Sequence, residues 1–88
     1  MIKARVVVML KADVMDPQGV AVGQALESLG HGHVKKVRVG RAFDLELDTN
    51  DPAQAEADVR KMCESLLANM VIEKFEVTVE QPSAAGVA

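Results

Sequence analysis

The chain has 88 residues, of which 49% are hydrophobic, with two phenylalanines, one cysteine and a formal net charge of −3. This length fits one small domain, and the acidic balance excludes a general attraction to nucleic acid or anionic membranes. One cysteine excludes an internal disulfide, no apolar run reaches about 18 residues, and no signal peptide is evident, so we expect a soluble cytoplasmic protein.

The first half of the chain predicts a strand, a helix and a second strand. Apolar residues alternate over about residues 2–11, which indicates a half-buried strand. Asp16 and Pro17 then start a helix, because Asp is a good N-cap and Pro needs no N–H donor at the first helical position. The helix is expected over about residues 17–29, and its buried stripe is expected to consist of Val22, Ala25, Leu26 and Leu29. A strand over residues 34–39 is expected to follow.

The second half repeats this pattern. A strand is predicted over about residues 42–48, and Asp51 with Pro52 starts a second helix that extends to about residue 68. A last alternating strand covers residues 73–80. Both halves therefore use the same order of elements and the same type of helix start.

The repeat across a tight turn at Gly40 predicts an α+β fold of the ferredoxin-like type, β-α-β-β-α-β. This is a two-layer sandwich: an antiparallel sheet in the strand order 4-1-3-2, with both helices on one face. We expect residues 1–80 to form this single domain and residues 81–88 to form a flexible C-terminal tail. The fold alone does not give the function, because it hosts enzymes, regulatory modules and adaptors.

The sheet face without helices is predicted to carry charges whose sign alternates from strand to strand. Cross-strand pairs of this kind stabilise a solvated sheet. The first strand also places Val7 and Met9 on that face, and exposed apolar residues there indicate a contact with another chain. We therefore predict a homodimer or a higher homo-oligomer.

No arrangement of residues predicts catalysis or metal binding. Cys63 falls on the apolar stripe of the second helix and is expected to be buried and unreactive. His31 and His33 lie on a loop with no third ligand nearby, so no metal site is expected. The open face of the predicted sheet carries Val7, Met9, Asp44 and Glu46 on its central strands, and so lacks aromatic residues that could stack RNA bases. A stand-alone ACT-like regulatory domain, which senses a small molecule at the loop before the first helix, remains an alternative.

Four segments carry a resemblance to a known family. They are Lys11–Gly19 (KADVMDPQG), Val37–Arg41 (VRVGR), Glu46–Asp48 (ELD) and Met62–Glu73 (MCESLLANMVIE). In this order and spacing they resemble the PurS family, the small subunit of phosphoribosylformylglycinamidine synthase (FGAM synthase). The resemblance covers almost the whole chain. Asp13 and Met70 depart from the family pattern, which usually has Gly and often Pro there, so we expect altered connector conformations.

The resemblance implies a non-catalytic accessory subunit in de novo purine biosynthesis. Such a subunit bridges the glutaminase subunit (PurQ) and the large synthetase subunit (PurL), so that ammonia passes between them. ATP, Mg and glutamine are then expected on the partner subunits, and this chain is expected to bind no cofactor and to supply no catalytic residue.

The residues singled out are accordingly expected to contact partners. They are Val7, Met9, Asp16, Pro17, Gln18, Gly19, Arg38, Gly40, Arg41 and Asn69. Structural roles remain open for several of them: Pro17 starts a helix and Gly40 permits a turn. Arg38 could also pair across the sheet with Asp44 or Glu46.

Overall fold

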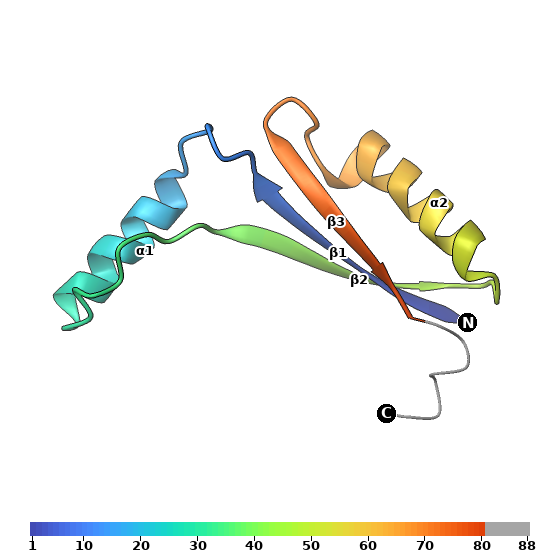
Figure 1. Ribbon diagram of the computed structural model, residues 1–88, viewed down its shortest axis with the longest axis horizontal. Coiled ribbons are helices and arrows are strands. Elements are labelled where there is room, and N and C mark those ends of the chain that lie inside the picture. Colours follow the sequence, from blue (N-terminus) through green and yellow to red (C-terminus); the bar gives the residue numbers. More distant parts are fainter. Residues whose placement is uncertain (81–88) are drawn as a thin grey trace.

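The computed structural model describes residues 1–80, so the tail expected over residues 81–88 lies outside the described part (Figure 1). The elements in chain order are β1 (Ile2–Leu10), α1 (Pro17–Ser28), β2 (Gly40–Leu47), α2 (Pro52–Met62), a π-helical turn η1 (Cys63–Leu67) and β3 (Glu73–Val79). Within residues 1–80, no helix has the length and apolar character that crossing a membrane requires.

The three strands form one antiparallel sheet in the order β2-β1-β3. Val6 at the centre of β1 lies opposite Phe43 of β2 on one side and Val77 of β3 on the other. These strands are the first, third and fourth predicted from the sequence, in the predicted neighbour order. The α+β class and the ferredoxin-like order of elements are confirmed.

The strand predicted over residues 34–39 is wrong, because this segment pairs with no strand of the described chain and β2 begins only at Gly40. The physical reason lies in its hydrogen bonds. The Val39 N–H donates to the Asp16 carboxylate, and the Arg38 guanidinium donates to carbonyls that follow β1. The segment is thus bonded to the start of α1 instead of the free edge of β2.

Helix α1 is the second departure from expectation. It projects beyond one end of the sheet instead of lying on it, as Figure 1 shows, so within residues 1–80 the inner sheet face is covered by α2 and the turn that follows it. Within α1 only Gly19 is buried, and Val22 of the expected buried stripe is 41% exposed. The radius of gyration is 16.6 Å, against about 12 Å for a compact chain of this length. We call α1 and residues 29–37 the arm.

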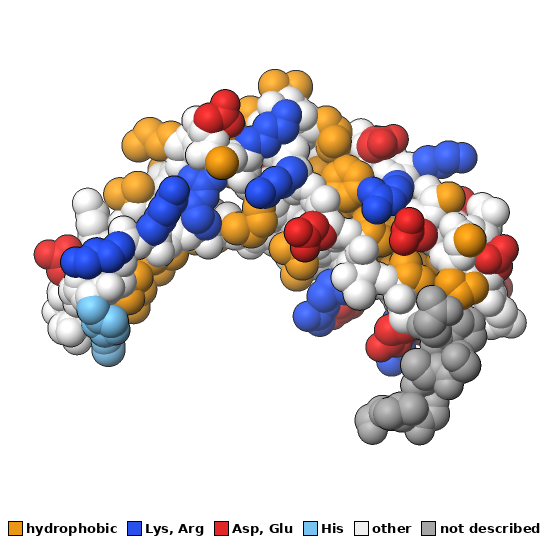
Figure 2. Space-filling view, viewed as in Figure 1, with side chains coloured by type: hydrophobic (Ala, Val, Ile, Leu, Met, Phe, Trp, Pro, Cys, Tyr) orange, Lys and Arg blue, Asp and Glu red, His pale blue; other side chains and the backbone are white. Residues whose placement is uncertain are grey.

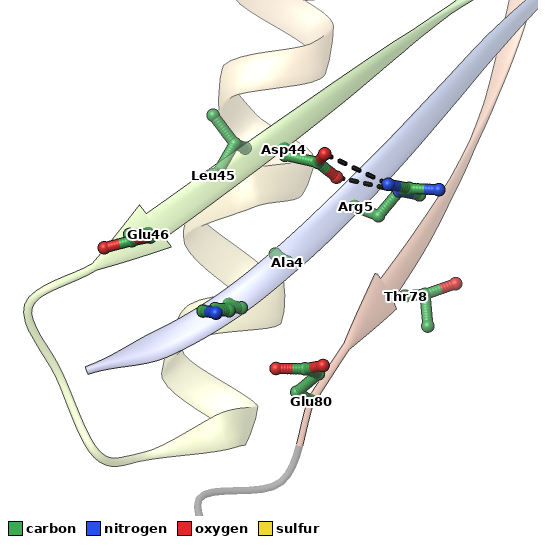
Figure 3. A pocket seen from close by; sticks show the side chains of 8 residues that line it. Ala4, Arg5, Asp44, Leu45, Glu46, Thr78 and Glu80 are labelled. Atoms are coloured by element: carbon green, nitrogen blue, oxygen red, sulfur yellow. Dashed lines mark hydrogen bonds and ion pairs between the residues drawn. The ribbon is translucent and has the colours of Figure 1, made fainter. Parts of the chain in front are cut away.

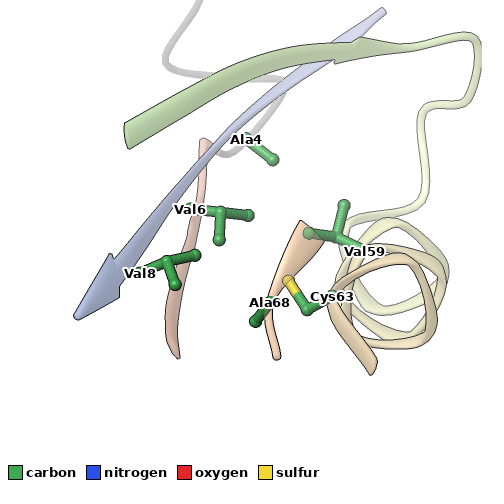
Figure 4. Packing of buried hydrophobic residues seen from close by; sticks show 6 residues of the cluster. All are labelled: Ala4, Val6, Val8, Val59, Cys63 and Ala68. Carbon is green, nitrogen blue, oxygen red and sulfur yellow. The ribbon is translucent and has the colours of Figure 1, made fainter. Parts of the chain in front are cut away.

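The hydrophobic core lies between β1 and α2 (Figure 4). It consists of Ala4, Val6, Val8, Val59, Cys63 and Ala68. Cys63 is fully buried, as predicted, and burial raises the pKa of its thiol. The wide π turn at the end of α2 is closed by a hydrogen bond from the Ala68 N–H to the Cys63 carbonyl. α2 packs over β1 and β3. The inner face of β2, made of Phe43, Leu45 and Leu47, is half-buried, as are Phe75, Val77 and Val79 of β3.

Candidate functional site

Asp16 holds together the start of α1 and the segment that returns from α1 to β2, next to the end of β1. One carboxylate oxygen accepts from the Gly19 N–H at 2.8 Å and so caps the N-terminus of α1, as the Asp-Pro start predicts. The other accepts from the Val39 N–H, also at 2.8 Å, on the segment that returns from α1 to β2. Asp16 is only 6% exposed. Its hydrogen bonds from Val39 and Gly19 favour the charged form and lower the pKa of the carboxyl group.

Gly19 lets the returning segment approach α1 closely. A Cβ atom at this position would collide with the Val37 carbonyl oxygen, so no other residue fits without a shift of the backbone. Gly23, one turn further along the helix, differs in this respect. A Cβ atom there would lie 3.7 Å from a Val37 methyl group, which is an ordinary contact.

Arg38 fastens the same return segment to the end of β1. Its guanidinium donates to the carbonyl oxygens of Lys11 at 2.9 Å, Val14 at 3.2 Å and Leu10 at 3.3 Å. Leu10 is the last residue of β1, and Lys11 and Val14 lie in the connector between β1 and α1. Arg38 therefore forms neither of the cross-strand pairs that the sequence left open, with Asp44 or Glu46.

Arg41 makes a two-pronged ion pair with Glu73 at the start of β3, with both N–O distances 3.0 Å. The same guanidinium donates to the Leu67 carbonyl, where the π turn ends. Glu73 is 8% exposed and also accepts from the Asn69 N–H at 2.7 Å. The Arg41 guanidinium, and then the Asn69 N–H, hold the pKa of Glu73 below its ordinary value.

We call this connected set, residues 10–19, 37–41 and Glu73, the junction. It surrounds a shallow depression of about 250 Å³ next to Pro17, Gln18 and Gly40. Among residues 1–80 no cluster of three or more potential metal ligands occurs. The polar groups of the junction already bond to one another, so the arrangement fixes the direction in which the arm leaves the sheet.

Most of the predicted contact residues meet at the junction. The DPQG turn at Asp16, Arg38, Gly40 and Arg41 lie within it, and the Met9 side chain contacts Gly40. Asn69 joins it through Glu73. Val7 lies apart from the junction, on the open sheet face, where it is 36% exposed. Whether these residues also contact a partner stays a prediction.

Glu73 and the Val39 N–H are functional groups of the junction that the sequence did not predict. Glu73 resembled an ordinary polar residue at the start of a strand, and its partner Arg41 is 32 residues away in the chain. The available signal was the position of Glu73 four residues after Asn69, which allows its side chain to turn back on that backbone N–H.

A second hollow, of about 560 Å³, lies along the opposite ends of the strands (Figure 3). Arg5 and Asp44 form a two-pronged ion pair across β1 and β2, with an N–O distance of 2.7 Å. Both side chains are well exposed, so this pair contributes little to stability. Of the charge pairs expected on the open sheet face, it is the one that forms within residues 1–80.

We predict that Gly19→Ala lowers the free energy of unfolding by about 1–3 kcal/mol, because the added methyl group forces the return segment away from α1. The matched control is Gly23→Ala, which should raise stability by up to about 1 kcal/mol, as Ala replaces Gly inside a helix with room for the methyl group. Urea unfolding followed by circular dichroism measures both. Equal tolerance of the two changes would contradict the close approach at Gly19.

We also predict that acid weakens the fold through Asp16 and Glu73. Their pKa values lie below the ordinary 3.8 and 4.5, so the folded chain binds fewer protons than the unfolded chain. Their contribution is complete above these ordinary values and is lost as the pH falls through the lower folded-state pKa values. Urea unfolding at a series of pH values from 7 to 3 should show this decline.

The matched variants are Asp16→Asn and Asp48→Asn. Asp16→Asn should be less stable at pH 7 and should lose less stability in acid, because it removes one of the carboxyl groups whose pKa folding lowers. Asp48 is exposed, and its variant should follow the unmodified chain. An acid dependence of Asp16→Asn identical to that of the unmodified chain would show that Asp16 does not stabilise the junction.

Comparisons with known proteins identify the family. The family model described as PurS, phosphoribosylformylglycinamidine (FGAM) synthase, matches residues 3–81. The chain is 43% identical to phosphoribosylformylglycinamidine synthase subunit PurS of Bacillus subtilis over 81 residues, which are 92% of this chain and 95% of that protein.

Two solved structures are similar. Methanocaldococcus jannaschii PurS, described as one of the subunits of formylglycinamide ribonucleotide amidotransferase in the purine biosynthetic pathway, has a TM-score of 0.84 and 36% identity, covering 92% of this chain and 98% of that one. A chain in the structure of PurLQS from Thermotoga maritima has a TM-score of 0.80 and 31% identity, covering 91% of this chain and 99% of that one. The chain therefore belongs to the PurS family of FGAM synthase subunits.

Proposed function

We propose that this chain is a non-catalytic accessory subunit of FGAM synthase in purine biosynthesis. The observation that carries this proposal is its similarity, over almost its whole length, to a chain in the PurLQS structure. By this likeness its partners are a large synthetase subunit (PurL) and a glutaminase subunit (PurQ). It bridges them in the cytoplasm for ammonia transfer, while ATP, Mg and glutamine bind to the partners and no cofactor binds to this chain.

The hydrogen bonds of the junction support a structural role. Both oxygens of Asp16 accept from backbone N–H groups, and Arg38 and Arg41 donate to carbonyl oxygens and Glu73. A small-molecule sensor of the ACT type would bind its ligand at the turn beginning with Asp16. That carboxylate is already occupied and nearly buried, which favours the accessory subunit over the sensor.

The subunit acts as a homodimer in which each arm covers the sheet of the other copy. Val22 and Leu29 on the arm are exposed, while Phe43 and Leu45 on the inner face of β2 are only half-buried. A helix of a second copy laid on β2, beside α2, buries both apolar surfaces and completes the second layer of the sandwich.

The distribution of charge supports the same exchange. The arm, residues 17–37, carries Lys35 and Lys36 against Glu27, whereas the rest of residues 1–80 carries eight Lys and Arg against twelve Asp and Glu. In Figure 2 basic side chains follow one another from the α1 end toward the sheet, and acidic ones are frequent on the side of α2. An arm from one copy therefore meets a body of opposite charge in the other, which favours association. Val7 and Met9, on the open face, remain predicted contacts with a further subunit.

The assembly role is tested by amidine formation with the purified synthetase and glutaminase subunits of the same organism, with and without this chain. We expect turnover with glutamine to require the chain, and turnover with free ammonia to proceed without it, because only the first reaction needs the two active sites to be coupled. Equal rates with both nitrogen sources in its absence, together with no complex in gel filtration, would overturn the proposal.

The arm exchange is tested by Val22→Asp, which places a carboxylate on the apolar side of α1. Burial of this charge should weaken dimerisation by about a hundredfold or more, or about 3 kcal/mol. Gln24→Asp adds the same charge on the other side of the helix and should leave the dimer intact. Sedimentation equilibrium measures both variants. If Val22→Asp remains a dimer as stable as Gln24→Asp, the arm is not the contact between copies.

A further inference from the structure

The outer edge of β3 is a surface that the arm exchange does not use. β3 pairs with β1 on one side only, and the Glu80 N–H donates to the Lys3 carbonyl at 2.9 Å. Because backbone direction alternates along a strand, the N–H and C=O groups of Phe75, Val77 and Val79 point away from β1. Among residues 1–80 these groups have no hydrogen-bond partner.

This edge lacks two of the devices that commonly keep exposed edge strands from pairing, a Pro and a β-bulge. The strand does carry charges: Glu73 is bound to Arg41 on the inner face, and Lys74 and Glu76 lie on the exposed face. β3 contains no Pro, and its pairing with β1 runs without a bulge from Glu73 to Val79. Its residues Phe75, Val77, Thr78 and Val79 are of the types that favour strands.

The sequence of β3 is complementary to itself in one antiparallel register. With Val77 opposite Val77 of a second copy, Lys74 lies opposite Glu80, Phe75 opposite Val79, and Glu76 opposite Thr78. A shift of the centre by one residue in either direction is unfavourable. It sets Glu76 against Glu76, or Glu76 against Glu80. We propose that β3 pairs with β3 of a second copy in the register centred on Val77, joining two sheets into one.

The position of α2 is compatible with this pairing. α2 lies over both β1 and β3, on the inner face of the sheet. A two-fold axis perpendicular to the sheet keeps both copies of α2 on that face. With strands about 4.8 Å apart, the two helices lie about 10 Å from each other, which is an ordinary distance for packed helices.

The β3 pairing gives the chain a second two-fold interface, separate from the exchanged arms. Two different two-fold interfaces in one subunit allow an assembly of four copies when they close on each other. The arms bury the inner face of β2, at the other edge of the sheet, and need nothing from β3. The two proposals can therefore fail independently.

Cysteine cross-linking reads the register directly. In the proposed pairing, residues 76 and 78 face each other as a pair without mutual hydrogen bonds, with Cα atoms about 4.5 Å apart, which suits a disulfide. The double variant Glu76→Cys/Thr78→Cys should therefore form a cross-linked dimer after mild oxidation, visible on a non-reducing denaturing gel. The single variants Glu76→Cys and Thr78→Cys are the controls and should not cross-link, since each cysteine then faces Thr78 or Glu76. The natural Cys63 is fully buried and common to all three.

The possible outcomes separate cleanly. Cross-linking of the double variant alone supports the proposed register. Cross-linking of Glu76→Cys by itself shows a register centred on residue 76, cross-linking of Thr78→Cys shows one centred on residue 78, and no cross-linking of any variant shows that the edge does not self-pair. Each of these three results overturns the proposal. Repeating the double variant with Val22→Asp added should leave the cross-link unchanged, because the arm is not involved.

A charge exchange tests the same contact in solution. Lys74→Glu places two carboxylates opposite each other at both ends of the paired strands and should weaken the association of four copies by about tenfold or more. Adding Glu80→Lys restores opposite charges and should restore the association. Sedimentation velocity over a range of concentrations measures both variants. No change with Lys74→Glu, or no recovery in the double variant, would contradict the pairing.

Discussion

The rest of the structure depends on the two oxygen atoms of one carboxylate. Asp16 holds the first turn of α1 with one oxygen and the returning chain at Val39 with the other. A chain that leaves and returns through the same point cannot at once extend along β2 as a fourth strand. The sheet therefore stops at three strands, and α1 points away from it. This one arrangement leaves the inner face of β2 without a helix of its own chain and leaves the apolar side of α1 exposed.

The two arginines of the VRVGR segment bond to opposite sides of the junction. Arg38 donates to three carbonyl oxygens at the end of β1, while Arg41 reaches Glu73 and the end of the π turn. A planar guanidinium with several fixed donors suits these multiple acceptors, and the single ammonium group of Lys does not. Their positions make the segment a structural tie between the arm, the sheet and the start of β3.

The elements that local pattern decides were predictable from the sequence. Alternation gave β1, β2 and β3, and the Asp-Pro pairs marked the start of both helices. Local pattern could not predict that residues 34–39 form no strand. Val34, Val37 and Val39 alternate with polar residues well enough for a strand, but the hydrogen-bond partners of the segment, Asp16 and the carbonyls after β1, lie more than 20 residues away.

The candidate site was also predictable only where residues with strong local preferences mark it. The DPQG and VRVGR segments stood out because Pro, Gly and Arg have strong local preferences, and the structure brings them together. Glu73 did not stand out, since a carboxylate at a strand start carries no local sign of its distant partner. The burial of α1 could not be judged from its own stripe either. A helical stripe of apolar residues shows that a surface is to be covered, but not which chain covers it.

The exposed arm also has a consequence for the life of the chain before it is assembled. α1 has 12 residues, and a helix of this length without tertiary contacts is marginal in water. Where no partner covers it, the arm therefore unfolds locally far more often than the core, which exposes its backbone to proteolysis. Under the proposed exchange of arms, a copy without a partner is then cut sooner than a copy in a dimer.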